Sequence, residues 1–213
     1  MYISRIWLDA TKRPTMKALA SPRLFHGAIE RAFPTHGVRR LWRLDPLRGR
    51  WCLLIVSPDV PDLSEAVAQF GFPGLPDACQ TRDYAPLLAR IRAGGCWHFR
   101  LTANPTHSAK SPNEDPRGQR GTVYPHVTPE HQRQWLLDRA ERHGFALAKD
   151  DFDVVHSQWH VFRKDGEGSP VRLLSATFEG LLSVVDADLF TAALTGGIGR
   201  AKAYGMGLLT VVR

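Results

Sequence analysis

The chain contains few cysteines, few methionines and no long apolar stretch. Its 213 residues include three cysteines and three methionines. Cys52, Cys79 and Cys96 are odd in number and far apart, which argues against a disulfide framework and against a zinc ribbon built from C-x-x-C pairs. No apolar run approaches the roughly 20 residues that a membrane-spanning helix needs. The N-terminal residues are too short and too interrupted for a signal peptide, so we expect a cytoplasmic protein with no membrane partner.

Basic residues outnumber acidic ones. Lys and Arg total 28 against 21 Asp and Glu, which gives a formal net charge of +7 and an isoelectric point of about 9.7. A basic balance favours a polyanion such as RNA or DNA as partner, provided that the cations cluster on one surface. Hydrophobic residues make up 43% of the chain, a share typical of a globular protein with a proper core.

Apolar periodicity and turn residues predict a mixed order of strands and helices. In the first half we expect strands at 2–8, 41–45, 51–56 and 97–101, helices at 21–33 and 63–70, and a polar connection between 9 and 20. In the second half we expect helices from 129 to 143 and from 186 to 194, and strands at 154–163, 171–178 and 207–212. Ser21 is the expected N-cap of the helix at 21–33, and Gly144 the left-handed stop of the helix before it.

This order predicts an α+β fold of two tandem ferredoxin-like (RRM-like) βαββαβ domains. The first domain spans 1–103 and contains the helix that carries His26. Residues 104–121 are rich in Pro, Ser, Asn, Gly and charge, a composition typical of a linker or mobile loop. The second domain spans 122–213, with a basic hairpin around 163–172 and a glycine-rich C-terminal loop. Trp42, Trp51, Trp97 and Trp135 lie in apolar patterns and are expected in the core.

The stretch from Gly196 to Leu209 is the most informative part of the sequence. Five glycines bracket two cations, Arg200 and Lys202; the glycines are Gly196, Gly197, Gly199, Gly205 and Gly207. Because glycine accepts positive φ and has no Cβ, such a backbone turns sharply and can approach a ligand closely. Backbone amides and cations together suit an anion.

The terminal pattern resembles the glycine-rich loop of the CRISPR repeat-processing endoribonucleases of the RAMP superfamily. Taken over the whole length, the chain resembles the CasE family, which serves type I-E Cascade systems. The matching segments are Ser21-Pro22 through His26, Leu41-Trp42-Arg43-Leu44, Phe99 through Pro105, Phe178 through Leu182, and the glycine-rich end.

The resemblance implies a specific reaction. Members of the family cleave precursor CRISPR RNA at the base of the repeat stem-loop without a metal ion, and the ribose 2′-hydroxyl is the nucleophile. The products carry a 2′,3′-cyclic phosphate and a 5′-hydroxyl. The enzyme then keeps the hairpin and becomes a Cascade subunit. We therefore expect no cofactor, and the expected partners are the CRISPR repeat RNA (crRNA hairpin) and other Cascade proteins.

His26 is the candidate catalytic residue. Helical spacing places it at the border of the apolar face of its helix, with Arg23 and Glu30 projecting nearby. The resemblance assigns the family's catalytic histidine to this position, and histidine suits proton transfer because its unperturbed pKa is near neutrality. Some relatives carry a tyrosine where this chain has Arg23. A guanidinium stays charged, so Arg23 is expected to stabilise the transition-state phosphate. Tyr204, Lys202 and Lys17 remain open candidates for the second proton transfer.

Seven cations are candidate RNA-binding residues: Arg31, Lys110, Arg163, Lys164, Arg172, Arg200 and Lys202. Arg163, Lys164 and Arg172 flank one predicted hairpin, which suits contact with RNA phosphates rather than with bases. The competing interpretation of these charges is a solvated surface. The competing function is a non-catalytic crRNA-binding subunit of the same superfamily.

Overall fold

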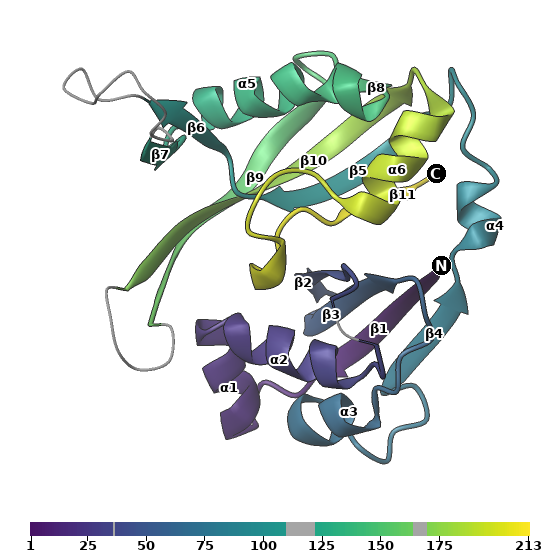
Figure 1. Cartoon of the computed structure of the whole chain (residues 1–213), viewed down its shortest axis with the longest axis vertical. Coiled ribbons are helices and arrows are strands. Elements are labelled where there is room, and N and C mark those ends of the chain that lie inside the picture. Colours follow the sequence, from purple (N-terminus) through teal and green to yellow (C-terminus); the bar gives the residue numbers. More distant parts are fainter. Residues whose placement is uncertain (36, 110–121, 164–169) are drawn as a thin grey trace.

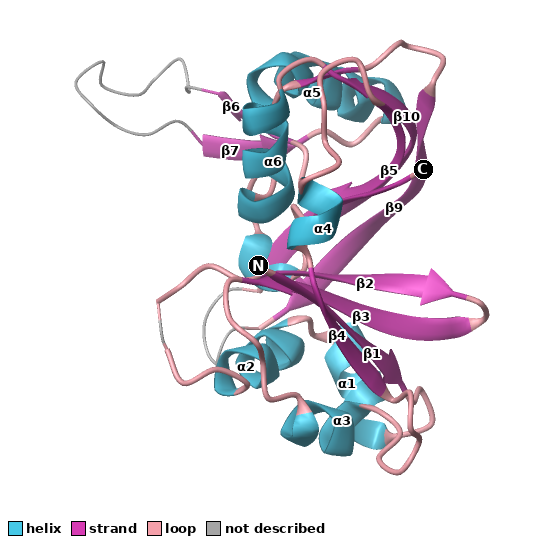
Figure 2. Cartoon of the chain, turned by 90° about the vertical axis from the view of Figure 1, so that its right-hand side faces the viewer, coloured by secondary structure: helices cyan, strands magenta, loops and turns pink. Residues whose placement is uncertain are grey.

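The computed structural model describes residues 1–35, 37–109, 122–163 and 170–213. Figure 1 shows two halves, one above the other, each with an antiparallel sheet. The helices cover the outer sides of the sheets, and the other faces of the two sheets turn toward each other (Figures 1 and 2). None of the helices in these described ranges has the length and apolarity that crossing a membrane requires.

The first half contains a four-stranded sheet with the order β2-β3-β1-β4. Its strands are β1 (Tyr2–Leu8), β2 (Leu41–Leu47), β3 (Arg50–Ser57) and β4 (Cys79–Asp83). The helices α1 (Arg13–Ala20), α2 (Arg23–Arg31) and α3 (Ser64–Phe70) pack on one face of it. Phe25 of α2 forms the centre of this core, with ring centroids 5.0 Å from Phe70 and 6.0 Å from Trp42.

The second half contains a five-stranded sheet in which β11-β5-β10 are neighbours and β8 and β9 both pair with β10. The strands are β5 (Cys96–Ala103), β8 (Phe145–Ala146), β9 (Phe152–Phe162), β10 (Val171–Val184) and β11 (Leu209–Val212). The helices α5 (Pro129–Ala140) and α6 (Ala187–Gly196) cover it. Three shorter helices are α4 (Ala85–Leu88), η1 (Glu141–His143) and η2 (Lys202–Tyr204).

Several predicted elements are confirmed, and others are corrected. The hairpin strands, α5 and the left-handed Gly144 lie where the pattern predicted them, and Thr128 is the N-cap of α5. The strand predicted to close the first half, β5, pairs instead with β10 and β11 of the second sheet. The first sheet is completed by β4, which the sequence did not predict. The predicted polar connection contains α1, and Ser21 is the C-cap of that helix; the N-cap of α2 is Pro22.

The segment predicted as a linker begins as a strand. β6 (Thr106–Ala109) pairs with β7 (Thr122–Pro125) in a small separate sheet. Threonine and valine favour extended backbone, and this preference outweighs the polar composition here. The rest of the predicted linker, from 110 to 121, lies outside the described residues.

A buried arginine joins the two halves. The side chain of Arg43 on β2 is only 2% exposed, and its Nη2 lies 2.7 Å from Oδ2 of Asp45. Its Nη1 donates hydrogen bonds of 2.8 Å to the backbone carbonyl oxygens of Arg100 and Leu208, and its Nη2 donates to Oγ1 of Thr210 at 2.8 Å. A buried guanidinium needs such partners, because an unpaired buried charge is costly. The two sheets are therefore held at a fixed relative position.

Candidate catalytic residue and nucleic-acid interface

Helix α2 places His26 at the edge of the first core. Phe25, Ala28 and Ile29 are buried on its inner side, and the His26 side chain next to them is 39% exposed. This is the border position that the helical spacing predicted. The C-terminal loop reaches the same helix, since η2 contacts α2. An imidazole at this place is open to solvent on one side and fixed by a packed helix on the other.

A buried arginine anchors the acidic neighbour of His26. Oε1 of Glu30 lies 4.0 Å from Nδ1 of His26. Oε2 of the same carboxylate accepts a 3.0 Å hydrogen bond from Nη1 of Arg40, whose side chain is fully buried. The guanidinium of Arg40 also lies over the ring of Phe33, 4.0 Å from its centroid. Glu30 is therefore a fixed charge beside the imidazole.

The other residues considered for the reaction lie on α1, α2 and η2. Arg23 is the first residue of α2, one turn before His26, and is partly exposed. Lys17 is exposed in the last turn of α1. Tyr204 of η2 packs against Phe162, with ring centroids 5.0 Å apart. Tyr204, Lys17 and Lys202 stay the candidates for the second proton transfer.

The glycine-rich loop follows α6 and is packed against two indole rings. Gly199 and Gly205 both have positive φ, +84° and +80°. A Cβ at Gly205 would lie 2.6 Å from the ring of Trp42, and one at Gly199 would lie 3.1 Å from the ring of Trp135. These glycines are needed for close approach to tryptophan, whereas the sequence suggested close approach to a ligand. Gly197 and Gly207 also have positive φ, and Gly196 ends α6.

Lys202 forms a hydrogen bond within the glycine-rich loop. Its Nζ donates a 2.7 Å hydrogen bond to the backbone oxygen of Gly196. Partial burial lowers the pKa of Lys202, and the positive charge of Arg39 lowers it further. Burial and the cations Arg142, Lys202 and Arg139 likewise lower the pKa of His143. The loop therefore lies in a region where positive charges repel one another, which an anion would relieve.

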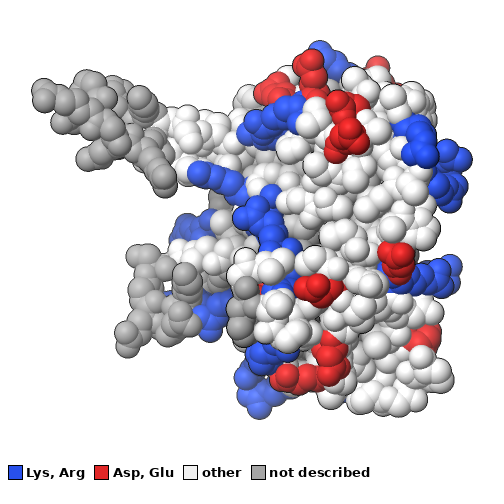
Figure 3. Space-filling model, turned by 45° about the vertical axis from the view of Figure 1, so that its right-hand side comes forward, with Lys and Arg blue, Asp and Glu red and all other residues white. Residues whose placement is uncertain are grey.

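The predicted RNA-binding cations are distributed over both halves. Arg31 faces α3, with its Nε 3.0 Å from Oε1 of Glu65. Arg163, which directly follows β9, and Arg172 on β10 are exposed on the same hairpin. Arg200 is exposed in the glycine-rich loop. Lys110 and Lys164 lie outside the described residues. In Figure 3 several Lys and Arg side chains follow one another from the upper half down to the lower half, and Asp and Glu side chains lie beside them as well as above.

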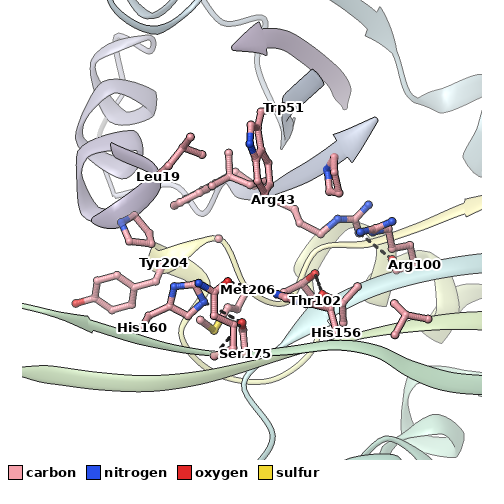
Figure 4. A pocket seen from close by; sticks show the side chains of 18 of the residues that line it. Leu19, Arg43, Trp51, Arg100, Thr102, His156, His160, Ser175, Tyr204 and Met206 are labelled. Atoms are coloured by element: carbon pink, nitrogen blue, oxygen red, sulfur yellow. Dashed lines mark hydrogen bonds between the residues drawn. The ribbon is translucent and has the colours of Figure 1, made fainter. Parts of the chain in front are cut away.

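A cavity of about 520 Å³ lies between the two sheets. In Figure 4 Leu19, Arg43 and Trp51 of the first half face His160 and Ser175 of the second. Nε2 of His160 lies 2.9 Å from Oγ of Ser175, and burial lowers the pKa of this histidine. Trp51 is 38% exposed here, so its predicted place in the core is wrong, while Trp42, Trp97 and Trp135 are buried as predicted. Among the described residues, His26 does not line this cavity.

The sequence pattern did not single out two cations, Arg139 of α5 and Arg142 of η1. Arg139 and Arg142 lie close to the glycine-rich loop and line a second cavity with Arg200. Arg139 follows Trp135 at a spacing of four, which places both on one face of α5, and Arg142 follows three residues later in η1. The spacing could have indicated a cationic site beside Trp135. It was not recognised because this segment has charged residues on several sides.

The fold and the site together define a basic α+β protein with a half-exposed histidine beside a cationic loop. A family model described as "CRISPR associated protein" matches residues 1–213. The chain is 31% identical to the CRISPR-associated endoribonuclease Cse3 of Thermus thermophilus over 99% of both chains. It is 27% identical to the Cascade subunit CasE of Escherichia coli over 57% of this chain and 60% of that one.

A solved structure of Thermus thermophilus Cse3, bound to an RNA that represents a pre-cleavage complex, has a similar fold. The TM-score is 0.79 at 25% identity, with 100% of this chain and 98% of that one covered. The chain therefore belongs to this family of CRISPR-associated proteins.

Proposed function

We propose that the protein is an endoribonuclease that cleaves precursor CRISPR RNA at the base of the repeat stem-loop and retains the product as a Cascade subunit. The carrying observation is the half-exposed imidazole of His26 on a packed helix, in a chain similar over its full length to Cse3. Relatives with this fold include an RNA-bound Cse3 and a Cascade subunit. The proposed partners are accordingly the repeat RNA and other Cascade proteins.

The proposed reaction needs two proton transfers. The ribose 2′-oxygen attacks the adjacent phosphorus as it loses its proton, and the bond from phosphorus to the 5′-oxygen breaks as that oxygen gains one. The products are a 2′,3′-cyclic phosphate and a 5′-hydroxyl. His26 transfers one of the two protons, and Arg23 stabilises the negative charge of the transition state. Glu30, held by Arg40, orients the imidazole.

The proposed grip on the RNA combines the hairpin and the loop. Arg163, Lys164 and Arg172 contact the phosphates of the stem, and Arg200 and Lys202 contact those near its base. Arg31 and Lys110 add further phosphate contacts, and for Arg31 this requires a change of partner from Glu65. The glycine-rich loop supports this grip through its packing on Trp42 and Trp135.

We also propose that both halves are ferredoxin-like. In a ferredoxin-like sheet the four strands, numbered in chain order, lie side by side as 4-1-3-2. The first half has this order as β4-β1-β3-β2. The second half has it as β11-β5-β10-β9, since β5, β9, β10 and β11 are its first to fourth strands. Because β5 pairs in the second sheet, we propose a domain boundary between β4 and β5 in place of residue 103.

The second candidate function is a non-catalytic subunit that only holds crRNA. It is favoured by Arg23, since a guanidinium cannot replace the tyrosine of some relatives in proton transfer. Under this candidate the protein binds a repeat hairpin and never cuts it.

The test is to incubate the protein with an end-labelled repeat hairpin in EDTA and to map both the cut and the end groups. The first function predicts one cut at the base of the stem, a cyclic phosphate at the new 3′ end, and no cut when the nucleotide before the scissile bond is 2′-deoxy. Cleavage of the deoxy substrate would contradict attack by the 2′-hydroxyl. Tight binding with no cleavage of either RNA would support the second function.

A further inference from the structure

A second cavity, of about 340 Å³, lies between α5, β6 and the glycine-rich loop. Three of its lining residues are arginines from three successive or separate segments: Arg139 of α5, Arg142 of η1 and Arg200 of the glycine-rich loop. Ser108 adds a hydroxyl group. No carboxylate is among the described residues that line it. Cations that converge in a concave site without acidic partners are suited to an anion.

Arg139 is held in place in this cavity, and the charge of Arg142 repels it. The guanidinium of Arg139 lies 4.3 Å from the ring centroid of Trp135 and donates a 3.0 Å hydrogen bond to the backbone oxygen of that residue. Burial lowers the pKa of Arg139, and the charge of Arg142 lowers it further, while Asp138 on the same helix acts in the opposite direction as the smallest of the three effects. An anion would replace this repulsion by attraction.

The position of the cavity indicates which anion it takes. Gly199 packs on Trp135, which also lines the cavity, so the loop forms one wall. The same loop continues through η2, which contacts the helix that carries His26. A polymer with regularly spaced phosphates can contact the cavity and the region near His26 at the same time. A free ion in the cavity cannot also contact the region near His26. Arginine is also the residue best suited to phosphate, because its planar fork can donate two parallel hydrogen bonds.

We propose that the cavity formed by Arg139, Arg142 and Arg200 binds a phosphodiester of the same RNA strand, away from the bond that is cut. This inference rests on the proposed function insofar as the ligand is the repeat RNA. It adds to the loop a second wall, formed by α5 and η1, whose arginines the sequence pattern did not identify as RNA-binding.

The test compares Arg142→Ala, Arg200→Ala and a control, Arg82→Ala. Arg142 and Arg200 are exposed, and so is Arg82 on β4 of the other half, so each variant should fold. The measurement is the dissociation constant for a repeat hairpin with flanking strands, over a series of KCl concentrations. A lost phosphate contact should reduce the slope of log K against log salt by about 0.7 to 0.9. We expect this in each of the first two variants, with affinity lowered about tenfold at low salt, and no change in Arg82→Ala.

Equal slopes and affinities in all four proteins would overturn the proposal. A further arm measures the rise in melting temperature caused by inorganic phosphate. If Arg142→Ala and Arg200→Ala abolish that rise but leave RNA binding unchanged, the cavity takes a free anion and the proposal is wrong. The proposed function fails separately: a wild-type protein that binds the RNA and never cuts it would contradict cleavage, while the salt slopes would still decide the cavity.

Discussion

Gly205 illustrates what single residues contribute to the site. It has a φ of +80°, and a Cβ added to it would lie 2.6 Å from the ring of Trp42, which is 1% exposed. Trp42 in turn contacts Phe25, the neighbour of His26. The absence of a side chain at Gly205 therefore lets the C-terminal loop pack against the core that supports the helix carrying His26.

Gly205→Ala should lower the free energy of unfolding by on the order of 2 kcal/mol or more, because the new methyl group overpacks a buried ring and the left-handed backbone is strained. Urea unfolding followed by circular dichroism measures this. Gly196→Ala is the matched control, since a Cβ there meets nothing within 4 Å and should leave stability equal or slightly higher. A similar stability for both variants would contradict the packing account.

At the residue scale, the family resemblance made His26 a candidate, and the composition of the C-terminal stretch made its glycines and cations candidates. The sequence could not identify what the glycines touch. Contacts such as that between Gly205 and Trp42 join residues 163 positions apart in the chain, and no local pattern encodes them. The buried pair of Arg40 and Glu30 was missed for a related reason, since arginine is rarely fully buried and its pattern resembles that of a surface charge.

The elements follow the sequence where local pattern decides and depart from it where pairing decides. The hairpin β9–β10 was predicted from two extended runs around a turn. β4 was missed because Cys79-Gln80-Thr81-Arg82-Asp83 offers little apolar character and lies exposed at the edge of its sheet. β5 was recognised as a strand but assigned to the wrong sheet, because alternation specifies a strand and not its partner. The predicted second half had no strand before its first helix, and β5 is that strand.

The β9–β10 hairpin carries an element-scale prediction. Replacing both Arg163 and Arg172 by Ala should weaken binding of hairpins of different sequence to a similar extent, because phosphate contacts carry no sequence information. Titrations at several salt concentrations should show the slope of log K against log salt reduced by about 0.9 for each lost contact with duplex RNA, as estimated from B-form DNA. Arg90→Ala, an exposed arginine beyond α4, serves as the control. A loss confined to one repeat sequence would instead indicate base recognition.

At the scale of the whole molecule, the two halves are joined by buried polar groups as well as by apolar packing. Arg43 links β2 to the backbone near β5 and β11. Arg100 on β5 lies 3.1 Å from Asp45 on β2 through its Nε, and it also pairs with Glu179 on β10. The cleft between the halves is thus bordered by ionised groups and by histidines. The free energy of unfolding of the protein should therefore depend on pH.

His126, His143 and His160 all have a lowered pKa, with burial as the largest cause. In the unfolded chain these histidines bind protons at a higher pH than in the folded protein, so stability is retained above about pH 6.5 and is lost as the pH falls below it. The melting temperature should therefore fall between pH 7 and pH 5. His160→Gln should reduce this fall, and His98→Gln, on the exposed side of β5, should not. A melting temperature independent of pH in this range would contradict the assignment.

The most direct test of the central claim is the single-turnover cleavage rate of a repeat hairpin by the wild-type protein and by His26→Ala. Each protein is used at a concentration that saturates the RNA, in the presence of EDTA. If the exposed imidazole transfers a proton in the reaction, the variant should cleave about 100-fold more slowly or worse, and it should bind the hairpin as tightly as the wild type. Equal cleavage rates for the two proteins would contradict the account.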